Sequence, residues 1–194
     1  HPGSAHELAA GEAPAARRPL VKICSITNRA DAEAAVAAGA DILGFVFAES
    51  PRAAKVELLG ELADLEVLKV AVVVAGEGRR LPHGVEEARA AGLIDAVQFH
   101  GDEEPRECAR LAFPYYKALR LRGTEDAERI KAYHSPRVLI DAFSRDAYGG
   151  TGKRILAEVV DAAAEYGPLW LAGGIGPENV GVVVRPTVVD EPTD

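Results

Sequence analysis

Cys24 has the residue type and the setting of a general base. It ends an apolar segment, and Lys22 lies two positions earlier, so that in a strand both side chains share one face. A nearby ammonium group favours the thiolate, which is a better base than the thiol. The alternative is a small core residue, the usual role of a cysteine in an apolar strand. Cys108, in Glu107-Cys108-Ala109, lacks such a setting and is expected to pack in the core.

Asp141 is the candidate general acid. It directly follows the apolar run 138–140, where a carboxylate is costly to bury unless it is paired or hydrogen-bonded. Burial disfavours the charged form of a carboxyl group, so that the group can hold and deliver a proton near neutral pH. The alternative is a carboxylate that caps the loop that follows.

Two glycine-rich stretches have the composition of phosphate-binding loops. They are Gly149-Gly150-Thr151-Gly152-Lys153 and Gly173-Gly174, and each precedes an expected helix. Glycines let the backbone approach an anion, and the N-terminus of a helix presents free N–H groups to it. Each loop alone is weak evidence, whereas the two together favour a phosphorylated substrate.

Arg52 and His100 are candidates for substrate contacts. Arg52 follows Ser50-Pro51 and is either a solvated cation or a bidentate donor to a carboxylate. His100 is either a structural histidine or a group that contacts the substrate. The acidic run Asp102-Glu103-Glu104 is expected to face water and to favour the helix that follows it.

Two kinds of segment that would position these residues alternate from Leu20 onward. Apolar runs rich in Val, Ile and Phe are typical of strands buried on both faces, and the segments between them are rich in helix-forming residues. The expected strands are 20–24, 41–47, 68–74, 96–99, 116–121, 137–141, 169–172 and 187–190. The expected helices are 30–38 (capped by Thr27 or Asn28 and ended by Gly39), 56–64, 85–91, one from 105, 125–133, 155–166 and one from 177.

Repeated strand–helix units are compatible with two α/β architectures, an open doubly wound sheet and a closed eight-stranded barrel. The count of strands favours the (β/α)8 TIM barrel, with the C-terminal eighth βα unit trimmed or incomplete. In such barrels the reactive groups lie at the carboxyl ends of the strands and in the loops that follow them. Cys24, Arg52, His100, Asp141 and Gly173 all fall at such positions.

Length and composition limit the number of domains, the kinds of partner and the cellular compartment that the chain can be expected to have. The chain of 194 residues suits one domain, and we expect residues 20–194 to form it, after an arm at 1–19 that is flexible or the remnant of a processed or engineered end. A net charge of -8 disfavours nucleic acid and anionic membranes as partners. Two distant cysteines form no disulfide framework, which favours a cytoplasmic protein with reduced thiols. A monomer or homodimer is expected.

The motifs, taken in order, resemble those of the phosphoribosylanthranilate isomerase family over about residues 20–190. Any one of these motifs can arise by chance, whereas the ordered set is highly specific to the family. The set comprises Lys22-Ile23-Cys24, Gly44-Phe45-Val46-Phe47, Ser50-Pro51-Arg52, Val97-Gln98-Phe99-His100-Gly101-Asp102-Glu103, Asp141, Gly149-Gly150-Thr151-Gly152, Leu171-Ala172-Gly173-Gly174 and Pro177-Glu178-Asn179-Val180.

The resemblance implies an Amadori rearrangement of N-(5-phosphoribosyl)anthranilate, which needs no metal and no other cofactor. It implies that Asp141 protonates the ribose ring oxygen and that Cys24 removes the proton from sugar C2. It also implies that Arg52 binds the anthranilate carboxylate and that the two glycine loops bind the phosphate.

The sequence departs from the family pattern at two places. Ser25 stands where the family usually has glycine, and the acidic end 190–194 stands where the family usually continues with a phosphate loop and a closing helix. Two alternatives therefore accompany the main interpretation. One is a histidine-pathway or dual-specificity sugar-phosphate isomerase, although those relatives have aspartate in place of Cys24. The other is a non-catalytic phosphate-binding barrel.

Overall fold

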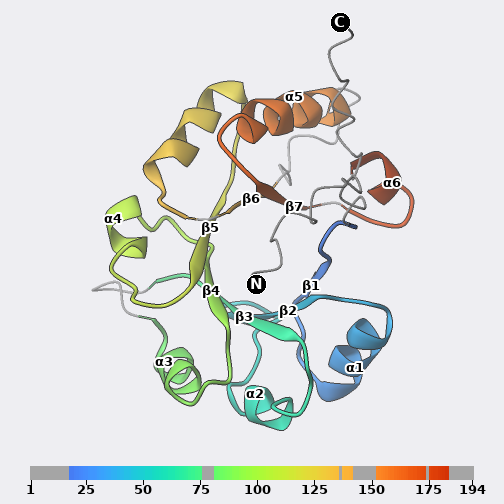
Figure 1. Cartoon of the computed structure of the whole chain (residues 1–194), viewed down its shortest axis with the longest axis vertical. Coiled ribbons are helices and arrows are strands. Elements are labelled where there is room, and N and C mark those ends of the chain that lie inside the picture. The colour runs from blue at the N-terminus through green and yellow to red at the C-terminus, as the bar shows by residue number, and fades with distance from the viewer. Residues whose placement is uncertain (1–17, 76–80, 136, 142–151, 174, 184–194) are drawn as a thin grey trace, which may run out of the picture.

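Strands and helices alternate along the chain in a computed structural model that describes residues 18–75, 81–135, 137–141, 152–173 and 175–183 (Figure 1). Seven parallel strands form one sheet in chain order, which confirms seven of the expected strands. The sheet curls around a common centre with the helices outside it, as in a TIM barrel (Figure 1). The eighth expected strand, at 187–190, lies outside the described residues, as does most of the arm at 1–19. The strands are β1 (Lys22–Cys24), β2 (Ile42–Phe47), β3 (Leu68–Val73), β4 (Ala96–Phe99), β5 (Tyr115–Leu119), β6 (Val138–Asp141) and β7 (Leu169–Ala172).

Local signals set the ends of several helices. Asn28 is the N-cap of α1, and its side-chain oxygen accepts a hydrogen bond from the backbone N–H of Asp31 at 2.8 Å. Gly39 follows α1 with a φ of 92°, in the left-handed region that favours glycine. The helices are α1 (Arg29–Ala37), α2 (Glu57–Glu61), α3 (His83–Ala90), α4 (Pro105–Cys108), η2 (Thr124–Ala132), α5 (Gly152–Ala164) and α6 (Val180–Val183).

One helix is wound more tightly than expected. η2 is a 3-10 helix, although its composition predicted an ordinary helix over 125–133. Ala127 and Ile130 are buried and Tyr133 packs beside Ile130, so the apolar side chains recur every three residues. That repeat matches the three residues per turn of a 3-10 helix.

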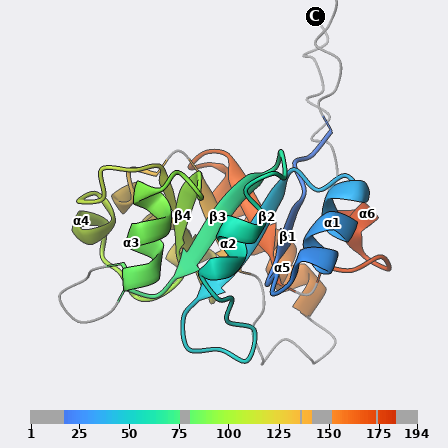
Figure 2. The same ribbon diagram turned by 90° about the horizontal axis from the view of Figure 1, so that it is seen from below.

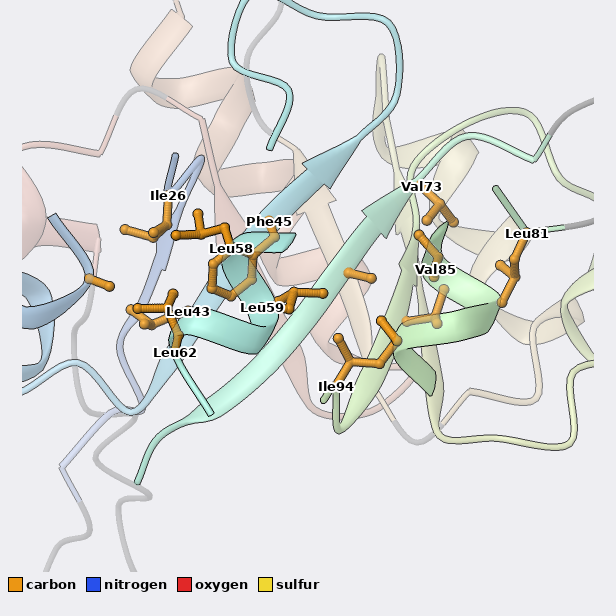
Figure 3. Close-up of a cluster of buried hydrophobic side chains, with 14 of the residues drawn as sticks. Ile26, Leu43, Phe45, Leu58, Leu59, Leu62, Val73, Leu81, Val85 and Ile94 are labelled. Atoms are coloured by element: carbon orange, nitrogen blue, oxygen red, sulfur yellow. The ribbon is translucent and has the colours of Figure 1, made fainter. Parts of the chain in front are cut away.

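The strands bury side chains on both faces of the sheet. On β2, Leu43 and Phe45 point outward (Figure 3). They pack against Leu58 and Leu59 of α2 and against Leu62, the C-cap residue of that helix. Figure 2 shows α1, α2 and α3 side by side along this outer face. Each fully buried large side chain of this layer contributes about 1.5–3 kcal/mol to folding.

The inner face of the sheet carries a second, smaller cluster. Ile42, Val70, Tyr116, Ala118 and Leu139 come from four strands and pack together there. Because side chains alternate along a strand, the residues two positions beyond members of this cluster also face inward. Inward-facing residues near the carboxyl ends of the strands therefore converge at one end of the curl.

Among the helices that the structure describes, none has the length and the apolar character of a membrane-spanning segment.

Candidate active site

Lys22 begins β1 and Cys24 ends it, and their side chains lie together, as their spacing predicted. Cys24 is exposed, and Lys22 is partly buried. Burial lowers the pKa of Lys22 below its usual value, whereas the charge of the Cys24 thiolate and a hydrogen bond to it act in the opposite direction. The ammonium group thus lies within hydrogen-bonding reach of the Cys24 sulfur.

Gly44 leaves the space that these two side chains occupy. It pairs with Cys24 in the register of β1 and β2. A β-carbon at Gly44 would lie 2.8 Å from the Cys24 Sγ and 2.9 Å from the Lys22 Nζ. Glycine within a strand often marks such a close approach. The sequence interpretation placed Gly44 in a motif but gave it no role.

We expect Gly44→Ala to lower kcat by about 10–100-fold, because the added methyl group displaces the thiol and misplacement by about 1 Å costs up to 10²-fold in rate. Gly60→Ala in α2 is the matched control, since a β-carbon there meets nothing within 4 Å. It should leave kcat unchanged and stabilise the helix slightly. Equal kinetics for the two variants would contradict the role given to Gly44.

A chain of polar contacts crosses the inner face from β1 to β6. The Lys22 Nζ donates to the Gln98 Oε1 at 2.9 Å, and the Gln98 Nε2 lies 2.7 Å from the His100 Nδ1. The His100 Nε2 lies 3.5 Å from the Asp141 Oδ2. The Tyr116 hydroxyl joins the chain by donating to the Gln98 Oε1 at 2.8 Å. Sequence reasoning did not find Gln98 or Tyr116 as site residues.

The thiol and the carboxyl group face the same interior. Cys24 shares a strand face with Lys22, whose ammonium reaches Gln98 within the curl. Asp141 shares a face with the interior residue Leu139, and its side chain is 20% exposed. A thiol and a carboxyl group thus lie at the carboxyl ends of β1 and β6, toward the inner face of the sheet.

Ser25 carries backbone strain next to the candidate base. Its φ is 69°, in the left-handed region that glycine adopts without a steric penalty. The geometry explains why glycine suits this position in the family that the motifs resemble. Serine keeps the same turn at the cost of local strain.

The remaining predicted site residues are placed as follows. Arg52 is exposed in the turn after β2, where its backbone N–H donates to the Ser50 Oγ at 3.1 Å. Gly173 directly follows β7 with a φ of 88°, a conformation that favours glycine. Gly149, Gly150 and Gly174 lie outside the described residues.

The expectation that the whole acidic run faces water is wrong for Glu103. Asp102 and Glu104 are exposed, but Glu103 is only 4% exposed. It accepts hydrogen bonds from the backbone N–H groups of Ala75 and Gly101, and from the buried Lys117 Nζ at 3.0 Å. These bonds satisfy a buried charge and fix the loop that carries His100.

Loss of the Glu103 charge should destabilise the fold. We expect Glu103→Gln to lower the free energy of unfolding by about 3–5 kcal/mol, because Lys117 stays buried without a counter-charge. Glu86→Gln is the control, since the Glu86–Arg89 pair spans 2.8 Å on the surface and an exposed pair contributes about 0–1 kcal/mol. Urea titrations of both variants measure the difference, and equal losses would refute the structural role of Glu103.

Cys108 is a core residue, as expected. It is fully buried, and burial raises the pKa of its thiol to about 11. The thiol therefore stays protonated and unreactive near neutral pH.

A hollow of about 530 Å³ opens at the other end of the strands, away from this cluster. Two of its acidic residues already have partners, since Asp41 pairs with Arg18 and Asp95 accepts from the backbone N–H of Lys69. No group of three or more metal-ligating side chains occurs among the residues that the structure describes. The polar cluster at the carboxyl ends, rather than this hollow, has the groups needed for acid–base chemistry.

A family profile described as N-(5'phosphoribosyl)anthranilate (PRA) isomerase matches residues 21–190. The chain belongs to this family. The N-(5'-phosphoribosyl)anthranilate isomerase of Geobacter metallireducens is 44% identical to it over 162 residues, which cover 82% of this chain and 79% of the relative.

Solved structures of phosphoribosylanthranilate isomerases share the fold. That from Thermotoga maritima aligns with a TM-score of 0.72 at 32% identity, over 85% of this chain and 82% of that chain. A second was solved in complex with reduced 1-(o-carboxyphenylamino)-1-deoxyribulose 5-phosphate. It aligns with a TM-score of 0.66 at 31% identity, over 85% of this chain and 80% of that chain.

Proposed function

We propose that the chain isomerises N-(5-phosphoribosyl)anthranilate to 1-(2-carboxyphenylamino)-1-deoxyribulose 5-phosphate, a step of tryptophan biosynthesis. Membership of the phosphoribosylanthranilate isomerase family supports the choice of substrate. The observation that carries the proposal is the polar chain that joins the surroundings of Cys24 to Asp141 across the inner face of the sheet.

In the proposed reaction Asp141 acts first, as the general acid. It gives a proton to the ribose ring oxygen, the bond between that oxygen and C1 breaks, and the nitrogen lone pair forms the C=N bond of an open-chain Schiff base. The carboxylate left on Asp141 faces the His100 ring at 3.5 Å. A polar neighbour already in place stabilises this charge without rearrangement.

Cys24 then acts as the general base. Its thiolate removes the proton from C2, and the electron pair moves into the C1–C2 bond to give an enolamine. The enolamine becomes the ketone when the C2 hydroxyl loses its proton and C1 gains one. The ammonium of Lys22 lies within hydrogen-bonding reach of the sulfur, where it would pair with the thiolate before this step.

The original protonation states of Cys24 and Asp141 must be restored after each turnover. Cys24 has gained a proton and Asp141 has lost one, whereas the substrate and product are isomers. Cys24 is exposed and the Asp141 side chain is 20% exposed, so both groups can exchange protons with solvent. The cycle needs no metal and no redox cofactor to close.

Substrate binding is proposed for the residues around this pair. Arg52 lies in the loop after β2, and its guanidinium has the fork of donors that suits the anthranilate carboxylate. Gly173 after β7, with Gly149, Gly150 and Gly174, is proposed to line the phosphate site. His100 contacts the acid and borders the space where the sugar would lie.

The test is to incubate the purified protein with freshly prepared phosphoribosylanthranilate and to follow the loss of its fluorescence. We expect turnover at micromolar substrate. The histidine-pathway substrate is assayed in parallel, and turnover of that compound alone would replace the proposal with the related isomerase. No loss of fluorescence at substrate concentrations far above the usual micromolar KM would indicate a barrel that only binds.

A further inference from the structure

We propose that Gln98 is a positioning residue that sets the imidazole tautomer of His100, so that the ring presents an Nε2–H group to Asp141. Gln98 is only 2% exposed, although it lies in the otherwise apolar strand β4. A buried amide is costly unless its polar atoms have partners, and three side chains surround this one. The inference rests on the proposed function, in which Asp141 is the general acid.

The partners of Gln98 determine which way its amide points. An ammonium group can only donate, so the atom 2.9 Å from the Lys22 Nζ must be the oxygen Oε1. The Tyr116 hydroxyl donates to the same oxygen at 2.8 Å. Rotation of the amide by half a turn would place its N–H groups against the ammonium of Lys22. Residues from β1 and β5 therefore hold the amide in one orientation.

This orientation determines the tautomer of His100. The Gln98 Nε2, which only donates, faces the His100 Nδ1 at 2.7 Å. The Nδ1 must then accept, and in a neutral imidazole the proton resides on the other nitrogen. That nitrogen, Nε2, lies 3.5 Å from the Asp141 Oδ2.

The two tautomers would have opposite effects on Asp141. An Nε2–H group stabilises the carboxylate that forms when Asp141 protonates the ring oxygen. The reverse tautomer would present a lone pair, which would accept the Asp141 proton in competition with the substrate. Gln98 thus favours proton transfer to the sugar without touching it.

The test measures the tautomer by ¹⁵N NMR of the ring nitrogens at a pH at which the imidazole is neutral. His100→Gln identifies the His100 signals among the five histidines. We expect the wild type to show the Nε2–H form. Gln98→Glu keeps the shape and still accepts from Lys22 and Tyr116, but its carboxylate cannot donate to Nδ1. It should therefore convert His100 to the Nδ1–H form.

The kinetic arm follows the same variants. We expect Gln98→Glu to lower kcat by about 10–100-fold, part of the ~10²–10⁴-fold that a general acid supplies, with little change in KM. Tyr116→Phe is the matched control. It removes the other hydrogen bond to Gln98, should keep the Nε2–H form, and should lower kcat less.

Two results would overturn the inference. One is an Nδ1–H form in the wild type, which decides the matter even if Gln98→Glu does not fold. The other is a folded Gln98→Glu variant that keeps both the Nε2–H form and the wild-type kcat. Failure of the proposed function is distinct, since the wild type would then not convert phosphoribosylanthranilate, whatever tautomer His100 adopts.

Discussion

Replacing Cys24 by alanine is expected to lower kcat by ~10²–10⁴-fold, the range that a general base supplies. The methyl group cannot remove the proton from C2, whereas Asp141 can still open the ring. The fold should persist, because Cys24 is exposed at the end of β1. Steady-state kinetics with phosphoribosylanthranilate, together with thermal unfolding, measure both effects.

Cys108→Ala is the control for this substitution. Cys108 is buried in the core, and its raised pKa keeps the thiol protonated near neutral pH. We expect the variant to lose some stability through the small cavity and to keep the wild-type kcat. A Cys24→Ala enzyme with kcat within tenfold of the wild type would remove the thiol from the mechanism.

Replacing Asp141 by asparagine should have an effect of similar size, ~10²–10⁴-fold in kcat. The amide has nearly the same shape but has no acidic proton to give to the ring oxygen, so the sugar stays closed. The loss should appear in kcat more than in KM, since the missing interaction is made in the transition state. Rapid-mixing kinetics should show no open-chain species in this variant.

Asp95→Asn serves as the matched carboxylate-to-amide control. Asp95 lies before β4, at the opposite end of the strands, where it accepts from the backbone N–H of Lys69 at 2.7 Å. Asparagine retains an acceptor oxygen there, and we expect an unchanged kcat. If the two asparagine variants lose activity equally, the loss cannot be assigned to proton transfer from Asp141.

Local sequence signals were sufficient to predict most of the fold. The two ends of α1 followed from Thr27 or Asn28 as the N-cap, of which Asn28 is the cap, and from Gly39 after the helix, because a capping side chain and a left-handed residue act within a few positions of a helix end. Apolar runs likewise marked seven strands. The 3-10 winding of η2 was not predicted, since composition alone does not separate the two helix types.

The site could be predicted only in part. Cys24 and Asp141 could be proposed because each ends an apolar strand, as the structure shows, and strand ends share one rim of a barrel. Gln98 was missed, because a glutamine in a strand shows its importance only once Lys22 and His100 are known to contact it. Such contacts join residues far apart in sequence.

Glu103 was misjudged for a similar reason. It lies within a run of three acidic residues, which usually faces water. Its partner Lys117 comes from the next strand, β5, and brings a buried positive charge beneath the loop after β4. Composition near Glu103 carries no sign of that charge, although Lys117 itself is a polar residue in the middle of a buried strand.

The fate of the hydrogen on C2 tests the proposed acid–base pair most directly. Phosphoribosylanthranilate that carries deuterium at C2 is converted by the wild type in ordinary water, and the product is analysed by mass spectrometry. Removal of the deuteron by the Cys24 thiolate, followed by exchange with solvent, predicts a product that has lost deuterium. Product that retains all of its deuterium, now on C1, would show that the hydrogen does not exchange with solvent and would contradict the account.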